Sequence, residues 1–314
     1  MVGRRDTEFR RTGESVSSQL SYVEAVVVGA FQGVTELFPV SSLGHAVLVP
    51  ALVGGRWAQD LNVSAPNSPY LAFIVGLHVA TAAALLVFFW RDWLAIVGGF
   101  ITSVRHRRVG TTAERLAWLM VLATIPVGIA GLALEHLFRT TLGRPVPAAV
   151  FLAINGVVLY TGERLRRRTP AVIGATLADS ALAPPDERIA KLPIGQGVLI
   201  GSAQILALLP GISRSGIAMV AGLWRGLNHE EAARFSFLLA TPVILAAGVL
   251  KIPDLFGPLG EGIHDQVLAG SVASFVAAYL AVRYLTRYFE TRTLTPFAIY
   301  CTVAGIGSLV WLLR

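Results

Sequence analysis

Apolar residues are gathered into long blocks along this 314-residue chain, and shorter polar segments separate the blocks. Six uninterrupted blocks lie at about 70–90, 114–133, 147–162, 231–250, 266–286 and 296–313. Their lengths approach the roughly 18–25 apolar residues with which a helix crosses about 30 Å of hydrocarbon, whereas a membrane β-barrel shows alternating segments of about ten residues. The pattern predicts an all-α polytopic membrane protein with six transmembrane helices.

Two further apolar blocks, at 22–53 and about 193–224, are interrupted in the middle by polar residues, proline and glycine. Matching residues recur in the same order: Gln32, Pro39, Ser41 and Ser42 in the first block, and Gln204, Pro210, Ser213 and Ser215 in the second. Two broken segments of this kind indicate an inverted repeat with a site near the membrane midplane. We therefore expect two re-entrant helix pairs besides the six spans.

The repeat predicts how the chain is organised. Residues 1–21 form a polar, basic N-terminal tail, and residues 22–314 form a single membrane domain. Within that domain we expect repeat halves at about 22–162 and 193–314, joined by a linker loop at 163–192.

Composition narrows the class of protein. Hydrophobic residues make up 54% of the chain and charged residues 14%, and the mean hydropathy is +0.64. Soluble domains contain about 25% charged residues, so the composition excludes a soluble enzyme, a nucleic-acid-binding protein and a disordered chain. The formal net charge of +7 is therefore interpreted as a determinant of membrane topology. The expected partner is a lipid bilayer and not nucleic acid. The single cysteine, Cys301, excludes an intrachain disulfide.

Basic residues predict the topology. They are concentrated at 91–113, 163–192 and 287–295, which places these segments in the cytoplasm, while 134–146 and 251–265 fit the outside. The block 193–224 must then enter and leave on the cytoplasmic side. For the block 22–53 two arrangements stay open: re-entry from outside, with the tail outside, or a single crossing, with the tail inside.

One charged residue stands in the middle of each broken block: Glu36 in the first and Arg214 in the second. A charge at this depth costs about 2.5–3.5 kcal/mol, so each side chain needs a partner or a polar cavity. A structural ion pair that closes the two repeats is one interpretation. It leaves the neighbouring serines and His45 without an explanation, which favours a functional site.

The residues around these charges are typical of phosphoryl chemistry. Gln32 and Glu36 share a helical face, Pro39 ends that helix, and Ser41, Ser42 and Gly44 follow in a break before His45. Pro210 and Gly211 break the second helix just before Ser213-Arg214-Ser215-Gly216. An arginine between two serines at a helix N-terminus is suited to clamp a phosphate. The alternative is that these serines only cap the next helix.

Such a clamp opposite an acid and a histidine suggests roles for individual side chains. Ser41 or Ser42 is a candidate nucleophile with His45 as general acid or base, and Glu36 orients His45 or holds a divalent cation. Arg214 would stabilise charge on the transferred phosphoryl group. His78 and Gln204 are weaker candidates that would line the same cavity.

The residues Gln32-Gly33-Val34-Thr35-Glu36-Leu37-Phe38-Pro39-Val40-Ser41-Ser42-Leu43-Gly44-His45 resemble the first signature of the bacterial undecaprenyl-diphosphate phosphatases associated with bacitracin resistance. The segment Pro210-Gly211-Ile212-Ser213-Arg214-Ser215-Gly216 resembles the second. The resemblance covers about 22–314. It departs from the family pattern at Gln32, where many members have Glu, and at Leu43, where members often have Thr.

This resemblance implies hydrolysis of undecaprenyl diphosphate to undecaprenyl phosphate and phosphate, which recycles the lipid carrier of peptidoglycan synthesis and confers bacitracin resistance. It implies a divalent cation, Mg²⁺ or Ca²⁺, and an outward-facing site in the bacterial plasma membrane. By position, the resemblance assigns catalysis to Glu36, Ser42, His45 and Arg214, phosphate binding to Ser41, Ser213, Ser215 and Gly216, and cation binding to Glu36 and Gln32. Whether Ser42 or His45 attacks phosphorus stays open, as does the formation of a homo-oligomer.

Two other classes of membrane protein fit parts of this pattern. A lipid flippase or a secondary transporter could use the same broken helices, and phosphate release would distinguish the enzyme from a carrier. A phosphatase of the vanadium-haloperoxidase-like type needs a histidine shortly after its Ser-Arg pair. Here Val220 stands six residues after Arg214 and the next histidine is His229, so that class is rejected.

Overall fold

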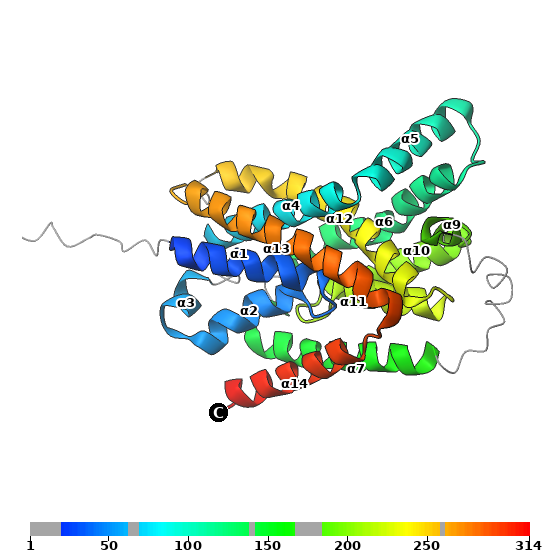
Figure 1. Cartoon of the computed structure of the whole chain (residues 1–314). Helices are drawn as coiled ribbons and strands as arrows, with labels where there is room; N and C mark the ends of the chain where they lie inside the picture. Colours follow the sequence, from blue (N-terminus) through cyan, green and yellow to red (C-terminus); the bar gives the residue numbers. More distant parts are fainter. Residues whose placement is uncertain (1–19, 62–68, 138–141, 167–183, 258–260) are drawn as a thin grey trace, which may run out of the picture.

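A computed structural model describes residues 20–61, 69–137, 142–166, 184–257 and 261–314. Within these ranges the chain is a bundle of helices that run lengthwise in Figure 1. The first half contains α1 (Tyr22–Leu37), α2 (Ser42–Val53), α3 (Gly55–Asp60), α4 (Pro69–Phe88), α5 (Trp90–His106), α6 (Thr112–Leu137) and α7 (Pro145–Arg166). The second half contains α9 (Pro185–Ala190), α10 (Ile194–Ala203), the 3₁₀ helix η2 (Gln204–Leu208), α11 (Arg214–Trp224), α12 (His229–Phe256), α13 (His264–Thr291) and α14 (Thr295–Leu312).

The two halves share one order of elements. A broken pair comes first, formed by α1 and α2 in one half and by α10, η2 and α11 in the other. Three long helices follow in each half: α4, α6 and α7 in the first, and α12, α13 and α14 in the second. The broken pairs enter from opposite ends of the bundle and meet in its middle (Figure 1). The fold is therefore all-α, with the inverted arrangement that the sequence predicted.

The first re-entrant pair shows why the chain turns back inside the bundle. A capping box of Ser21 and Glu24 starts α1, and the helix ends at Leu37, two residues before Pro39. Because the start of α1 and the end of α2 lie at the same end of the bundle (Figure 1), the block 22–53 is re-entrant. The single-crossing arrangement that the sequence left open is thus ruled out.

All six predicted spans are helices. In the described residues, five helices are long and apolar enough to cross a membrane, and α4 with α5, bent by 87° at a short break, makes a sixth. The helices extend beyond the predicted blocks by up to six residues, as at α12, which reaches Phe256. Charged and polar residues at these ends lower the local hydropathy without ending the helix.

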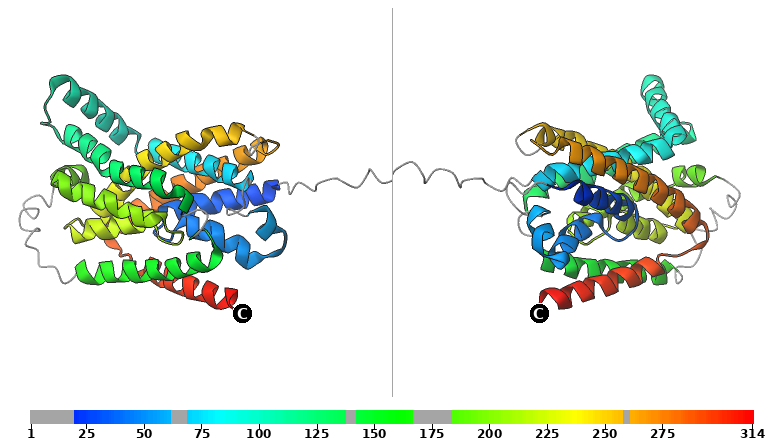
Figure 2. Two further views of the ribbon diagram at one scale, coloured as in Figure 1. Left: turned by 180° about the vertical axis from the view of Figure 1, so that it is seen from behind. Right: turned by 60° about the vertical axis from the view of Figure 1, so that its left-hand side comes forward.

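Three segments expected to be loops are partly helical. The segment 91–113 contains most of α5, the segment 54–69 contains α3, and 163–192 contains α9 and the end of α7; residues 62–68 and 167–183 lie outside the described ranges. Helix α5 buries Ile96, Gly99 and Ser103 along one side and projects from the bundle beside α6 (Figures 1 and 2). Its apolar run, 94–104, is shorter than a membrane span and has charged residues on both sides, so its sequence is typical of a loop between two spans.

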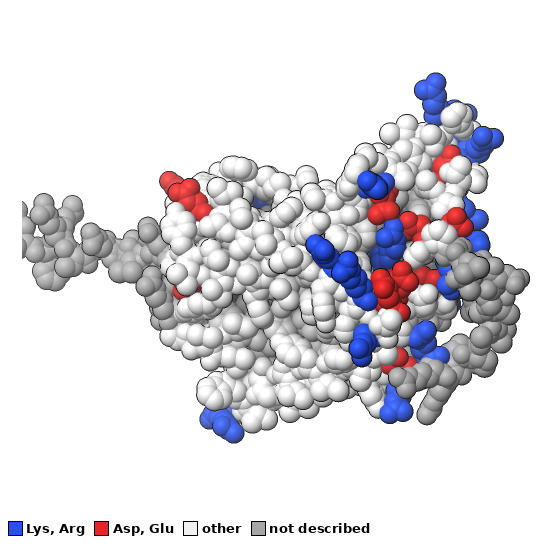
Figure 3. Space-filling model, viewed as in Figure 1, with Lys and Arg blue, Asp and Glu red and all other residues white. Residues whose placement is uncertain are grey.

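Charged side chains gather at one end of the bundle. On the face shown in Figure 3, lysine, arginine and the acids that accompany them lie mainly at the end where α9, α10 and the tip of α5 are found. The middle of the molecule is almost free of charge on this face. The C-terminus and the start of α1 lie at the opposite end (Figure 1).

Candidate functional site

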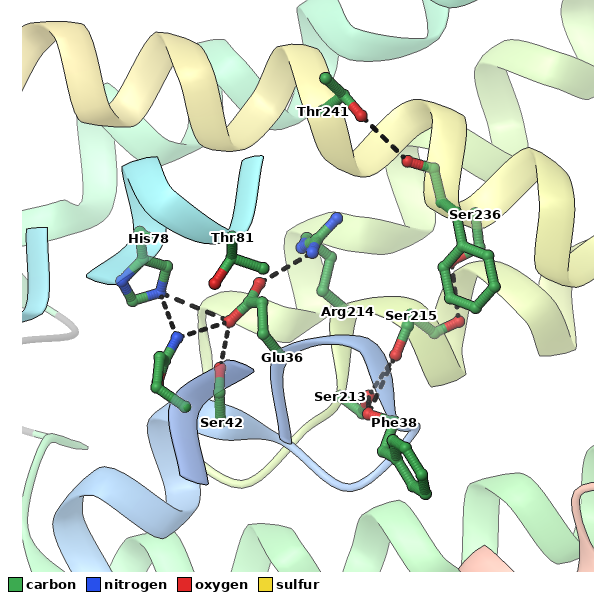
Figure 4. A network of polar contacts seen from close by, with 12 residues as sticks. Glu36, Phe38, Ser42, His78, Thr81, Ser213, Arg214, Ser215, Ser236 and Thr241 are labelled. Atoms are coloured by element: carbon green, nitrogen blue, oxygen red, sulfur yellow. Dashed lines mark hydrogen bonds and ion pairs between the residues drawn. The ribbon is translucent and has the colours of Figure 1, made fainter. Parts of the chain in front are cut away.

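The two re-entrant tips meet at the carboxylate of Glu36. Glu36 is in the last turn of α1, and Arg214 is the first residue of α11. Arg214 Nη2 donates to Glu36 Oε1 at 2.8 Å, although the two residues are 178 positions apart in the sequence (Figure 4). The side chains are only 14% and 6% exposed, so neither charge is left to water. The structure thus brings together the two charges that the sequence placed in separate blocks.

The second oxygen of Glu36 collects the remaining polar groups of the site. Gln32 Nε2, one helical turn earlier, donates to Oε2 at 3.1 Å, and Ser42 Oγ also donates to it (Figure 4). His78 of α4 places Nε2 3.4 Å from the same oxygen and 3.2 Å from Gln32 Nε2. The carbonyl of Ile74 accepts from His78 Nδ1 at 2.9 Å, which directs Nε2 into the site.

Two features show where a ligand would meet this cluster. The side chain of His78 is 29% exposed, more than those of Glu36 and Arg214, so the site is most open beside α4. Within the described chain, buried Arg214 Nη1 has no hydrogen-bond partner. A buried donor without a partner is uncommon and costly. One edge of the guanidinium therefore holds Glu36, while Nη1 keeps an unused donor that is suited to an anion.

Three serines predicted to bind phosphate hold the tips together instead of facing Glu36. Ser41 Oγ caps α2 by accepting from Gly44 N at 3.2 Å, and it also accepts from Gly211 N of the other tip at 3.1 Å. Ser213 Oγ caps α11 by accepting from Gly216 N at 3.1 Å. The Gly216 amide and the acceptor sides of these hydroxyls are engaged in capping bonds, as the capping alternative expected.

The remaining serine, Ser215, also bridges the tips. Its hydroxyl donates to Phe38 O at 3.2 Å, and its own carbonyl accepts from Ser236 Oγ of α12 at 3.2 Å. These contacts lie away from the Glu36 carboxylate in Figure 4. They connect the end of α1, the start of α11 and α12.

The first break is shorter than predicted. It comprises residues 38–41, and Ser42 and Gly44 belong to the first turn of α2. Ser41 adopts φ 71°, a conformation that few residues other than glycine adopt and that costs on the order of 1–3 kcal/mol. This turn directs the following residue, Ser42, at Glu36.

His45 faces a different part of the bundle from Glu36. Its Nδ1 donates to the Ser41 carbonyl at 2.7 Å, and its Nε2 lies 2.8 Å from the hydroxyl of Tyr300 on α14. The Phe31 ring packs edge-on against it at 5.5 Å. In the described structure no hydrogen bond joins His45 to Glu36, Ser42 or Arg214. His45 therefore supports the backbone of Ser41, while His78 is the histidine in contact with the carboxylate.

Gln204, the repeat counterpart of Gln32, lies apart from this network. It is 1% exposed at the start of η2, and its Nε2 donates to Gly201 O at 3.3 Å. Its position in the second tip matches that of Gln32 in the first, but the structure does not join it to Glu36.

Asn155 was missed by the sequence analysis. This fully buried residue of α7 donates from Nδ2 to Pro39 O at 3.1 Å and accepts at Oδ1 from Ser213 N at 3.0 Å. It therefore bonds to the backbone of both tips at once. The signal was a lone amide within an otherwise apolar predicted span, which is expensive in a membrane unless it is bonded.

The protein side chains do not form a cation site by themselves. Glu36 is the one carboxylate in the cluster, and donors already occupy both of its oxygens. Across the described ranges, no group of three or more histidine, cysteine, aspartate or glutamate side chains could hold a metal ion. Divalent cations such as Mg²⁺ and Ca²⁺ require several oxygen ligands, which these residues alone do not provide.

Comparison with known proteins covers almost the entire chain. Residues 25–307 match the model of a family described as bacitracin resistance protein BacA. An undecaprenyl-diphosphatase of Mycolicibacterium paratuberculosis is 75% identical over 307 residues, covering 95% of this chain and 99% of the relative. Undecaprenyl-diphosphatase 1 of Frankia casuarinae is 51% identical, covering 93% and 98%, and the enzyme of Granulibacter bethesdensis is 40% identical, covering 93% and 97%.

Proposed function

The chain belongs to the bacitracin resistance protein BacA family, and we propose that it hydrolyses undecaprenyl diphosphate at the cluster of Glu36, Ser42 and Arg214. The observation that carries this proposal is the convergence of a hydroxyl and a half-occupied guanidinium on one buried carboxylate. The products are undecaprenyl phosphate and inorganic phosphate. The activity recycles the lipid carrier of peptidoglycan synthesis and confers resistance to bacitracin.

Ser42 is the nucleophile in this proposal, because its hydroxyl already donates to Glu36. Ser42 Oγ forms a bond to the terminal phosphorus, and its proton moves to Glu36. The bond from that phosphorus to the bridging oxygen breaks, and undecaprenyl phosphate leaves with the electron pair. The leaving phosphate takes the proton from Glu36, which restores the carboxylate.

Water completes the reaction. A water molecule gives a proton to Glu36 and attacks the phosphorus bonded to Ser42 Oγ. The bond between that phosphorus and Oγ breaks, inorganic phosphate leaves, and Glu36 returns the proton to Ser42 Oγ. Arg214 Nη1 binds a phosphoryl oxygen during both steps, where the free edge of the guanidinium opposes the charge that develops. His45, held by Ser41 and Tyr300, acts as a positioning residue for the turn that presents Ser42.

We propose that a divalent cation, Mg²⁺ or Ca²⁺, arrives with the substrate. The diphosphate oxygens would supply the ligands that the protein lacks, and Glu36 and Gln32 would offer the nearest protein oxygens. The cation, when bound, neutralises part of the charge of the diphosphate. The protein residues keep the roles described above.

The chain is a multi-pass membrane protein, and we propose the bacterial plasma membrane with the charged end of the bundle in the cytoplasm. The α1–α2 pair then enters from outside, and substrate reaches His78 and Glu36 from the outer side. Cysteine at the exposed position Glu261, in the segment between α12 and α13, should react with an impermeant thiol reagent on intact cells. Cysteine at Arg107, beyond α5, should react only after permeabilisation; the reverse result would overturn this orientation.

The activity is tested with purified protein and undecaprenyl diphosphate. Ser42→Ala should lower phosphate release by about a thousandfold or more, because a nucleophile and its base act as one unit. Phosphate should be trapped on Ser42 in acid-quenched wild-type enzyme. His45→Gln should keep turnover within about tenfold while lowering thermal stability. Near-normal turnover of folded Ser42→Ala would overturn the role of Ser42, and lipid translocation without phosphate release would favour the flippase.

A further inference from the structure

A basic groove runs along the last three turns of α13, at the charged end of the bundle. Its volume is about 510 Å³, and its walls include Leu280, Arg283, Tyr284, Arg287, Tyr288 and Arg292. Arg283 and Arg287 are one helical turn apart, and Arg292 caps the helix, so the three guanidinium groups follow one side of α13. The groove is separate from the Glu36 cluster, and the proposed reaction does not use it.

Among the described residues, the arginines of this groove form no ion pair with an acid. At other places on the charged end, arginines are paired: Arg234 with Asp186 and Asp92, and Arg188 with Glu231. Within the described chain, no carboxylate lies within ion-pair distance of Arg283, Arg287 or Arg292, and all three are exposed. Glu290, on the same stretch of α13, forms no ion pair with them in the described structure. The three neighbouring positive charges repel one another, so a bound anion would stabilise this surface.

The groove combines apolar and basic side chains, and it becomes more basic toward the end of α13. Leu280, 57% exposed, and Tyr284, 54% exposed, lie toward the middle of the bundle, and Arg292 lies at its charged end. Twelve residues of helix separate Leu280 from Arg292, a rise of about 18 Å. This length suits an amphiphile whose chain lies beside Leu280 and whose phosphate lies among the arginines, and it is longer than a free phosphate requires.

Aromatic contacts join this groove to the first re-entrant tip. Tyr284 stacks on Phe38 with ring centroids 6.1 Å apart and an interplanar angle of 4°, and Tyr288 packs on Phe297, which also contacts Phe38. The carbonyl of Phe38 accepts the hydroxyl of Ser215 from the second tip. A molecule in the groove would therefore contact Tyr284, whose ring packs on Phe38 beside the junction of the two tips.

From this geometry we infer that the groove is a binding site for an anionic phospholipid of the surrounding membrane. The phosphate lies among Arg283, Arg287 and Arg292, and an acyl chain lies along Leu280 and Tyr284. Basic pockets beside spanning helices, close to the charged face of a membrane, are suited to such headgroups. The site adds a structural lipid to the protein, independently of the hydrolytic reaction.

Native mass spectrometry of the full-length protein in neutral detergent tests this inference. Phosphatidylglycerol, phosphatidylcholine and inorganic phosphate are titrated in parallel. Wild-type protein should retain phosphatidylglycerol with an affinity at least about tenfold above that for phosphatidylcholine. The triple variant Arg283→Gln, Arg287→Gln, Arg292→Gln should lose this preference. A matched variant, Arg105→Gln, Arg107→Gln, Arg108→Gln, removes the same charge from the exposed end of α5 and should keep affinity within about twofold.

Each result decides the inference. Equal losses in both triple variants would show a diffuse charge effect and overturn a defined site. Inorganic phosphate that binds the groove as tightly as the lipid would overturn the assignment to a phospholipid. The single change Arg287→Gln, at an exposed position, should weaken phosphatidylglycerol binding by about fivefold. This variant keeps the test decisive if the triple variant does not fold. No change in that variant would also contradict the inference.

Discussion

The two re-entrant tips are built to the same plan, and they differ in the residue that each presents. In the first tip, Ser41 caps α2 and Gly44 supplies the bonded amide; in the second, Ser213 caps α11 and Gly216 does the same. The residue directly after each cap is Ser42 in one tip and Arg214 in the other. Both of these side chains reach the single carboxylate of Glu36.

This comparison shows how a repeated fold acquires one asymmetric site. The pseudo-symmetry delivers two equivalent helix starts to the same place, and sequence differences make one of them a nucleophile and the other an anion-binding group. Glu36 has no acidic counterpart in the second tip, so the two starts share it. The shared carboxylate also ties the halves of the chain together in the middle of the bundle.

The tips also differ in how they turn. Ser213 has φ −83°, an ordinary value, whereas Ser41 has φ 71°. The second tip places its left-handed residue earlier, at Gly211 with φ 113°. A serine in this conformation is strained and a glycine is not, which places the backbone strain next to Ser42.

After Ser42→Ala, Arg214→Ala should have the largest effect on hydrolysis among changes that compare the tips. Hydrolysis should fall roughly 10²- to 10³-fold, because the donor for the phosphoryl oxygens is lost. Arg214→Lys should also be poor, since an ammonium cannot bind Glu36 and a phosphate through two edges. The measurement is phosphate release by purified variants, with Arg225→Ala at the other end of α11 as a matched control.

Stability measurements separate catalysis from folding in these variants. Removing one partner of a buried pair costs about 3–5 kcal/mol, so Arg214→Ala should also lower the melting temperature in detergent. Combining it with Glu36→Gln should restore stability without restoring hydrolysis. Turnover near the wild-type rate in folded Arg214→Ala would contradict the proposed clamp.

Gly211→Ala should be the most damaging of the glycine changes in the turns. A Cβ at this position would lie 2.5 Å from Ala148 O and 2.6 Å from Leu152 N, in a backbone conformation that alanine avoids. We expect a loss of about 3 kcal/mol in unfolding free energy, from strain and overpacking together. Gly54 has φ 70° and open space where a Cβ would lie, so Gly54→Ala causes backbone strain without overpacking. It should lower the unfolding free energy by about 1 kcal/mol. Equal thermal shifts would show that the tip contact does not matter.

Removing the two caps tests whether the tips are equally important to stability. Ser213→Ala should cost about 1 kcal/mol, the usual value for a lost N-cap. Ser41→Ala should cost about 2 kcal/mol, because Ser41 Oγ also accepts from Gly211 N of the other tip. Ser202→Ala, which removes a hydroxyl within α10, serves as the control and should be nearly neutral. Thermal unfolding of the three variants gives the comparison, and equal costs at Ser41 and Ser213 would contradict the asymmetry.

The sequence was sufficient for features set by hydropathy and by local chemistry. Uninterrupted apolar length predicted the six spans, and Pro39 and Pro210-Gly211 located both breaks. The approach of Glu36 to Arg214 was an expected consequence of two isolated buried charges. Local patterns of this kind do not depend on how the helices pack.

Features set by packing were not predictable in the same way. His45 and His78 have similar polar character in the sequence, and only the packing of α2 against α14 and of α4 against α1 shows which one reaches Glu36. The bridging role of Asn155 depends on both tips meeting beside α7. Helix α5 is not predicted because its apolar run, 94–104, is too short for a membrane span and lies between charged residues.

Gln32→Glu should have the smallest effect on the rate and the most specific effect on cation binding. Gln32 donates to Glu36 in this chain, so a carboxylate there would replace a donor with an oxygen ligand beside the existing one. Hydrolysis at saturating cation should change by less than about threefold, while a second acidic ligand should make the cation bind without diphosphate. Isothermal calorimetry with Mg²⁺ or Ca²⁺ alone should therefore show binding to the variant and none to the wild type.

The counterpart in the second tip provides the control for this last comparison. Gln204→Glu adds the same charge at the matching position, but Gln204 is bonded to Gly201 and has no contact with Glu36. Its cation binding should equal that of the wild type. Cation binding by wild-type protein without diphosphate would contradict the proposal that the cation arrives with the substrate. Only Gln32 is bonded to Glu36, so only a carboxylate at position 32 could share a metal with it. Equal gains in both variants would therefore show that the added charge, and not its location beside Glu36, attracts the cation.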